Sequence, residues 1–133
     1  MKDLITTLDK IIEELKDIQD YLEIEMGEDV EEAVDRGNRV SVYMARSGKL
    51  LADAKYHRDK KLRSDIVNEI KEIVKLPASS ANKFIDTFVE KESFVINWAD
   101  RINRSSTHQL EWCRTVISKA KAEMSAFNYN TKM

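Results

Sequence analysis

The chain has 133 residues and a formal net charge of −2, with 35% charged residues, three glycines, one proline and one cysteine. This length fits a single domain, residues 1–133, and the shortage of turn-forming residues argues against a sheet-rich fold. The lone cysteine excludes an internal disulfide and suits a reducing cytoplasm. No apolar run approaches the roughly 18 residues that span a bilayer, and the acidic N-terminal stretch lacks a signal-peptide core. We therefore expect a soluble, cytoplasmic protein.

The small net charge hides a division along the chain. Residues 1–35 hold 13 acidic and 3 basic residues, a balance of −10, whereas residues 36–133 carry a balance of +8. Such an asymmetry indicates either a basic binding surface or an acidic helix lying across a basic one. Ordinary solvated helix faces would give the same composition.

The first helix is predicted over residues 3–24. Its apolar residues alternate spacings of four and three, which is typical of one packed helical face: Leu4, Leu8, Ile11, Leu15, Ile18 and Leu22. Ile5 and Ile12 widen that face. Gly27 fits a C-terminal cap, and Asp29 fits the N-cap of the next helix.

The second helix is predicted over residues 30–76. Gly37 and Gly48 fall inside it, and each costs up to about 1 kcal/mol relative to Ala, so either could interrupt the helix. Pro77 ends the helix, because proline disfavours a helical residue before it. The predicted apolar face comprises Val30, Val34, Val40, Met44, Leu51, Leu62, Ile66, Ile70 and Ile73 or Val74.

The third helix is predicted over residues 79–124, with Ser79 or Ser80 as its N-cap. Residues 125–133 show no periodicity and are expected to fray. The fold class is therefore all-α: a short N-terminal helix packed on a long antiparallel helical hairpin with coiled-coil-like seams. The seam of the third helix is predicted to hold Phe84, Phe88, Val95, Ile102, Ser106, Gln109, Cys113, Val116, Ala120 and Met124.

The stretch NRSSTHQLEW, residues 103–112, interrupts that seam with polar residues. In a hairpin centred on the proline, Ser106 would lie opposite Gly48, and His108 would lie near Arg46. A serine that faces a glycine allows close packing, and Gln109 could fix the register of the two helices. This packing explanation does not account for the remaining polar residues, Asn103, Thr107 and His108.

Basic, aromatic and amide side chains gather on the facing segments of the second and third helices. Such groups recognise phosphates and stack on bases, although a solvated helix surface often has the same composition. We therefore predict a solvated basic-polar cleft that binds an anionic ligand and holds neither cofactor nor metal. The candidate ligand-binding residues are Tyr43, Arg46, Tyr56, His57, Asn103, Arg104, Thr107, His108 and Trp112.

Nucleophilic catalysis has little support in the sequence. Ser105 and His108 are three residues apart, but neither an acid nor an oxyanion hole accompanies them. Cys113 lies on the predicted seam and fits a small core residue better than a nucleophile. We therefore predict that the protein is not an enzyme.

One enzymatic pattern remains as a remote alternative. Glu14-x-x-Asp17 and Glu32-x-x-Asp35 resemble the carboxylate pairs of the all-helical nucleotide pyrophosphatases, which would hold Mg²⁺ for phosphoryl chemistry. The periodicity of the first helix turns Glu14 and Asp17 outward, and a stretch this acidic produces such spacings by chance. This places a magnesium-dependent pyrophosphatase well behind a binding protein.

Two stretches, SVYMARSGKLLADAKYHRDKK and WADRINRSSTHQLEWCRTVISKAKAEM, carry a resemblance that covers most of residues 40–124. They resemble small all-helical proteins of phages and prophages, often found among recombination or accessory genes. The shared segments coincide with the two polar patches described above. The resemblance implies a phage-type accessory protein acting in the cytoplasm of a host cell, but it implies no particular activity.

Oligomerisation follows from the predicted arrangement of the helices. Residues 56–98 would form a two-helix stalk about 30 Å long that the first helix does not cover. Two helices cannot bury its large apolar side chains, so we predict a homo-oligomer, most simply a dimer whose stalks form a four-helix bundle. These side chains are Ile66, Val67, Ile70, Ile73, Val74, Phe84, Ile85, Phe88, Val89, Phe94, Val95, Ile96 and Trp98.

Two functions fit these expectations. In the first, the oligomer binds a nucleotide, such as a host defence signal that it withdraws, or a nucleic-acid backbone. In the second, the chain is a protein–protein interaction module in phage recombination or packaging, with the acidic first helix as its contact surface. Neither function requires a membrane.

Overall fold

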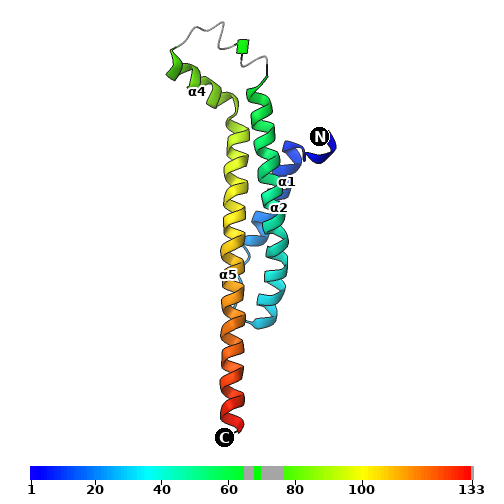
Figure 1. Ribbon diagram of the computed structural model, residues 1–133, viewed down its shortest axis with the longest axis vertical. Coiled ribbons are helices and arrows are strands. Elements are labelled where there is room, and N and C mark those ends of the chain that lie inside the picture. Colours follow the sequence, from blue (N-terminus) through cyan, green and yellow to red (C-terminus); the bar gives the residue numbers. More distant parts are fainter. Residues whose placement is uncertain (65–67, 70–76, 133) are drawn as a thin grey trace.

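The computed structural model describes residues 1–64, 68–69 and 77–132, and this part of the chain is all-helical (Figure 1). The elements are a 3₁₀ turn η1 (Lys2–Leu4) and the helices α1 (Leu8–Leu22), α2 (Val30–Leu62), α4 (Ala78–Phe88) and α5 (Glu90–Lys132). Helices α1, α2 and α5 pack against one another, and the all-α class is confirmed. No helix in the described residues has the length and apolar content needed to cross a membrane.

Helix α1 buries the face that its periodicity predicts, with Ile11, Leu15, Ile18 and Leu22 in the core. The predicted start at residue 3 is wrong, because the backbone is extended at Ile5 and the helix begins at Leu8. The cause is a tertiary contact: the Thr6 amide donates to the Asp53 carboxylate (3.0 Å) instead of entering a helix.

The turn between α1 and α2 is held by two side chains of α2's first turn. Asp29 is the N-cap, as predicted, and its carboxylate accepts from the Glu32 amide at 3.1 Å. The Glu32 carboxylate in turn accepts from the Gly27 amide at 3.4 Å. Gly27 is not the cap of α1, which ends at Leu22 with Glu23 as its C-cap.

Helix α2 runs without interruption through both of its glycines. Of the predicted apolar face, Val40 is fully buried, but Val30 and Val34 are exposed. The face that packs holds small and polar residues instead: Ala33, Arg36, Val40, Ser47, Leu50, Asp53 and Ala54. Small side chains let α5 approach α2, so volume and not hydrophobicity alone decides which face is buried.

The predicted end of α2 at residue 76 is wrong, because the helix ends at Leu62. The Ser64 hydroxyl donates to the Lys61 carbonyl (2.6 Å) and so binds one of the carbonyls that a helix end leaves without a partner. The predicted apolar residues Ile66, Val67, Ile70, Ile73 and Val74 lie outside the described residues.

The predicted third helix is two helices, because the chain bends at Val89 between α4 and α5. Val89 is buried, whereas no residue of α4 is fully buried. Neither Ser79 nor Ser80 caps α4. Pro77 is its N-cap, with an extended ψ of 148°, and the helix begins at Ala78.

Contacts between α2 and α5 occur in opposite order along the two helices. Lys61, near the end of α2, bonds to Glu92, near the start of α5, at 2.9 Å. Arg36, near the start of α2, bonds to Gln109, further along α5, at 2.8 Å. Gly48 faces Asn103 and not the predicted Ser106; a Cβ there would meet only the Asn103 Nδ2 atom, at an ordinary 3.8 Å.

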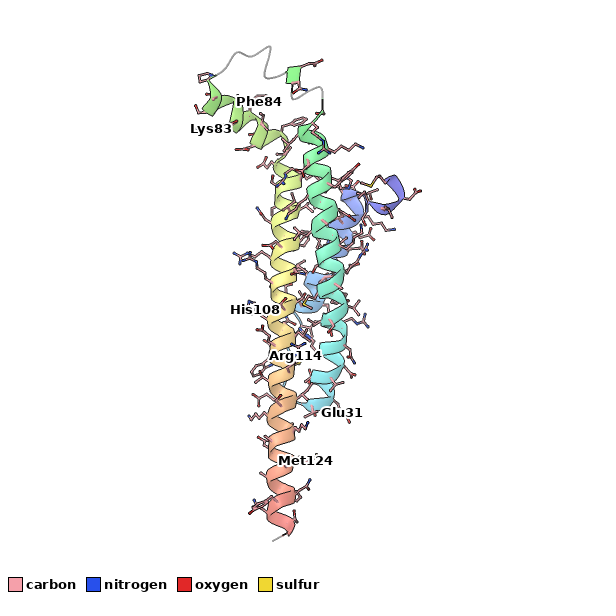
Figure 2. The ribbon with its side chains drawn as sticks, viewed as in Figure 1. Glu31, Lys83, Phe84, His108, Arg114 and Met124 are labelled. Atoms are coloured by element: carbon pink, nitrogen blue, oxygen red, sulfur yellow. The ribbon has the colours of Figure 1, made fainter. Side chains whose placement is uncertain are left out.

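Helix α5 continues past the start of α2 as a projection, which we define as residues 121–132 (Figure 1). In Figure 2, Met124 marks this projection and Glu31 marks the beginning of α2. The predicted fraying from residue 125 is wrong, since the helix extends to Lys132. Residues 121–131 are all exposed, so the projection gains nothing from packing within the chain.

Ending the chain after Ala120, which removes only the projection, should therefore leave the stability of the folded protomer unchanged. We expect the melting temperature to shift by no more than about 2 °C, as measured by circular dichroism. Ile11→Ala, in the fully buried core, is the reference and should cost about 2–5 kcal/mol. A truncation as damaging as Ile11→Ala would show that the projection is packed.

Candidate functional site

The nine predicted ligand-binding residues fall into two groups that do not share a cleft. Six of them have partners within the folded chain, Tyr56 only in the ring of its neighbour His57: Tyr43, Arg46, Tyr56, His57, Asn103 and Thr107. The other three, Arg104, His108 and Trp112, are exposed on the outer face of α5. Figure 2 shows His108 on the side of α5 away from α2. The structure thus separates Arg46 from His108, which the sequence placed together.

Arg46 belongs to a set of four α2 side chains that hold the N-terminal segment. Its guanidinium makes two hydrogen bonds to the Glu14 carboxylate, at 2.8 and 2.9 Å, which raise the pKa of Arg46 above its ordinary value. His57 Nε2 lies 2.6 Å from the Thr6 carbonyl oxygen. The predicted anion-binding roles of Arg46 and His57 therefore compete with structural contacts already made.

Asp53 and Lys49 complete this set, which we call the N-terminal clasp: Arg46, Lys49, Asp53 and His57. Lys49 Nζ donates to the Leu4 carbonyl (2.6 Å) and also pairs with the Asp53 carboxylate. Burial alone would raise the pKa of Asp53. The hydrogen bonds from Lys49 and Thr6, with the charge of Lys49, outweigh it and hold that pKa below its usual value. Spacings of three and four put all four residues on one face of α2, a signal visible in the sequence.

Asn103 and Thr107 of α5 contact residues of α2. Asn103 Nδ2 donates to the Met44 carbonyl (2.9 Å) and to Ser47 Oγ (3.1 Å), and the Thr107 hydroxyl donates to the Asn103 carbonyl (3.0 Å). Ser106, fully buried, donates back to the Ile102 carbonyl (2.8 Å). These polar residues of NRSSTHQLEW are therefore packing residues.

Gln109, predicted to fix the register of the two helices, binds Arg36, a contact that the apolar periodicity did not predict. Arg36, only 8% exposed, donates to Gln109 Oε1 from Nε (3.1 Å) and from its terminal nitrogen (2.8 Å). Both side chains also donate to the Leu22 carbonyl, at 3.2 Å from Arg36 and 2.8 Å from Gln109. The last carbonyl of α1 is thus bound by side chains from α2 and α5.

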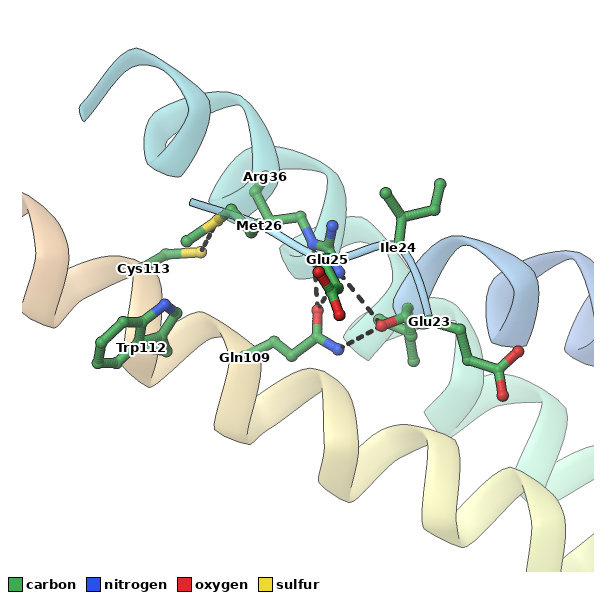
Figure 3. Close-up of a pocket in the computed structure, with 9 residues that line it drawn as sticks. Glu23, Ile24, Glu25, Met26, Arg36, Gln109, Trp112 and Cys113 are labelled. Atoms are coloured by element: carbon green, nitrogen blue, oxygen red, sulfur yellow. Dashed lines mark hydrogen bonds between the residues drawn. The ribbon is translucent and has the colours of Figure 1, made fainter. Parts of the chain in front are cut away.

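An open pocket of about 270 Å³ lies over this junction (Figure 3). Its floor holds the Arg36–Gln109 pair, and the Cys113 and Met26 sulfurs lie 3.9 Å apart. Its remaining lining residues are Leu22, Glu23, Ile24, Glu25 and Trp112. Two carboxylates and an already bonded guanidinium disfavour an anion here. Burial raises the pKa of the Cys113 thiol, although Arg36 nearby acts in the opposite direction, and this suppresses its reactivity.

The paired acidic motifs do not converge. Glu14 binds Arg46, and Glu32 binds the Gly27 amide. Over residues 1–64, 68–69 and 77–132, no three His, Cys, Asp or Glu side chains form a group that could hold a metal ion.

The outer face of α5 carries a continuous row of residues, which we call the outer stripe. Its members alternate spacings of four and three from residue 94 to residue 119, so they form a row that winds slowly along one side of the helix. The sequence places Phe94 and Trp98 among the stalk side chains that another copy should cover, but Arg101 was not singled out. Phe94 and Trp98 lie side by side, with ring centroids 6.1 Å apart. The outer stripe comprises Phe94, Trp98, Arg101, Ser105, His108, Trp112, Thr115 and Lys119.

Comparison with known proteins found no match: no family model, no curated protein and no solved structure corresponds to this chain.

Gln109→Ala should destabilise the protein strongly. The change leaves the buried Arg36 guanidinium with the Leu22 carbonyl alone, so we expect a loss of about 2–4 kcal/mol in urea unfolding. Arg114→Ala, an exposed site on the same helix, should stay within about 0.5 kcal/mol. The double variant Arg36→Met/Gln109→Leu should recover much of the loss, and equal losses in Gln109→Ala and Arg114→Ala would contradict this account.

The N-terminal clasp should weaken in acid. Because the folded-state pKa of Asp53 is depressed, its contribution is complete above the unfolded-state value of about 3.9 and is lost as pH falls through the folded-state value. The difference in unfolding free energy between the wild type and Asp53→Asn should therefore be constant at neutral pH and shrink below about pH 4. Urea titrations at several pH values measure it, and a difference that grows in acid would contradict the assignment.

Proposed function

We propose that this chain is a non-enzymatic interaction protein that acts as a homo-oligomer and makes its contacts along α5. In this proposal α2 and α5 are the two arms of an antiparallel hairpin, and hairpins from different copies form an oligomeric helical bundle. One observation carries the proposal: α5 exposes large apolar side chains along most of its length, namely Phe94, Trp112, Met124, Phe127 and Tyr129.

The length and exposure of α5 support this reading. A helix of 43 residues is about 65 Å long, and the projection has no intramolecular cover. Met124, Phe127 and Tyr129 there are 67–68% exposed. Scattered single apolar residues on a surface need no explanation, but several on one bare helix favour a contact with another chain.

The resemblance to phage and prophage helical proteins supports an accessory role in a host cell, in recombination or packaging. The interaction module is now preferred over the anion binder because six of the nine predicted ligand-binding side chains already have partners within the chain. The acidic first helix is a less suitable contact surface than α5, since Glu14 is engaged with Arg46.

Binding of an anionic ligand is the second candidate function, and exposed cationic side chains on α5 favour it. Arg101, Arg104 and His108 are exposed on neighbouring positions of α5, and Trp112 beside them is 47% exposed. Cationic groups spread along a helix beside an aromatic ring suit a nucleic-acid backbone with stacked bases better than a small pocketed nucleotide.

Sedimentation equilibrium at micromolar concentration tests the proposal. We expect a mass that is a multiple of the 15.4 kDa protomer. Titration with a single-stranded oligonucleotide at two salt concentrations tests the second candidate, because phosphate contacts must weaken steeply with salt. A 15.4 kDa monomer overturns the homo-oligomer, and salt-dependent oligonucleotide binding by that monomer would replace it with the anion binder.

A further inference from the structure

The outer stripe has the geometry of a second packing seam on α5. Alternating spacings of four and three are those of the a and d positions in a coiled coil. The inner face of α5 is already covered by α1 and α2, while the outer stripe is exposed except for Trp98. Trp98 is half-buried against the core and donates its indole N–H to Gln19 Oε1 of α1 at 3.1 Å. Phe94 is 66% exposed. The aromatic members Phe94 and Trp112 are large exposed side chains that a second helix would cover.

We propose that a second copy of this chain covers the outer stripe, with the two α5 helices antiparallel and the two-fold axis midway between Ser105 and His108. This inference rests on the proposed homo-oligomeric function. It adds which surface of α5 forms the dimer, the relative direction of the two helices and their register. From Phe94 to Lys119 the paired segment is about 38 Å long.

The polar members of the outer stripe find matched partners in this register. Arg101 lies opposite the partner's Trp112, and Lys119 lies opposite the partner's Phe94, so each cation meets an aromatic face. Ser105 lies opposite the partner's His108 at the two-fold axis. A parallel pairing would instead place Arg101 on Arg101, His108 on His108 and Lys119 on Lys119.

Flanking charges select this register over its neighbours. Arg104 and Glu111 directly precede the stripe residues Ser105 and Trp112 in the sequence, and both are exposed. In the proposed register Arg104 lies beside the partner's Glu111, twice per dimer by symmetry. A shift by one heptad in one direction brings Arg104 beside its own copy, and a shift in the other direction brings Glu111 beside its own copy. Like charges oppose both shifts.

Existing contacts of these two residues do not prevent the pairing. Arg104 pairs with Asp100 at 3.2 Å and Glu111 lies 3.6 Å from His108, in both cases between largely exposed side chains of the same helix. Exposed pairs of this kind are weak, so either residue can turn to a partner chain. The proposal also explains why residues 103–112 are polar on two faces: one meets α2, and the other meets its own copy around the symmetry axis.

Charge reversal in the full chain tests the register. Arg104→Glu and Glu111→Arg each place two like-charge pairs in the dimer, so each should raise the dimer dissociation constant at least about tenfold. The double variant Arg104→Glu/Glu111→Arg should return it to within about threefold of wild type. Arg114→Glu, exposed on the same helix but off the outer stripe, is the matched control and should change it less than about twofold.

Cysteine cross-linking tests the direction. Because Cys113 is buried, it does not compete with surface thiols. Ser105→Cys mixed with His108→Cys should give a disulfide-linked mixed dimer on oxidation, in larger yield than either variant alone. Equal linking of each variant to itself would overturn the antiparallel arrangement.

The outcomes separate the two proposals. A dimer that ignores both charge reversals overturns the register and leaves the homo-oligomer standing. A monomeric wild type overturns both proposals. A monomer that binds an oligonucleotide through Arg104, and loses that binding in Arg104→Glu, assigns the outer stripe to a polyanion instead.

Discussion

Three helices meet where the Arg36 guanidinium, the Gln109 amide and the last carbonyl of α1 bind one another. The guanidinium is nearly buried, so its charge is tolerable only while Gln109 Oε1 and the Leu22 carbonyl accept from it. Gln109 also donates to that carbonyl, which closes the triangle. Sliding α5 along α2, or lengthening α1 by a turn, would leave a buried polar group unpaired. The network therefore fixes the register of α2 and α5 and the point at which α1 ends.

The rest of the α2–α5 contact also pairs its buried polar groups by hydrogen bonds. Ser47 and Ser106 are fully buried, and each hydroxyl donates to a carbonyl of its own helix. Asn103 bridges to the other helix through the Met44 carbonyl and Ser47. Polar residues of this size fill little volume and leave no donor unpaired, so the helices pack closely without a continuous apolar seam. Specific hydrogen bonds replace part of the hydrophobic contact that such long helices normally share.

The apolar periodicity predicted the helix face that is buried through apolar residues. It failed for the helix ends and faces that polar contacts determine. The α1 face from Ile11 to Leu22 and the Asp29 cap follow from local chemistry and are confirmed. The start of α1 depends on Asp53, 47 residues away from Thr6, which no local pattern reveals. The end of α2 at Leu62 was missed because the apolar spacing continues beyond it in the sequence. Among the candidate site residues, Asn103 looks the same in a sequence whether it faces α2 or solvent. The sequence likewise does not reveal that Trp112 is exposed on the folded chain.

The long sequence separation of these contacts has a consequence for how the chain folds as it is made. Gln109 reaches back 87 residues to Leu22 and 73 residues to Arg36. Until α5 has left the ribosome, α1 and α2 have only each other as packing partners, and the surfaces of both that contact α5 stay uncovered. Closing such distant contacts costs chain entropy before any packing is gained, so the core cannot assemble progressively from the N-terminus. The packing of the three helices is therefore completed only after Gln109 has been synthesised.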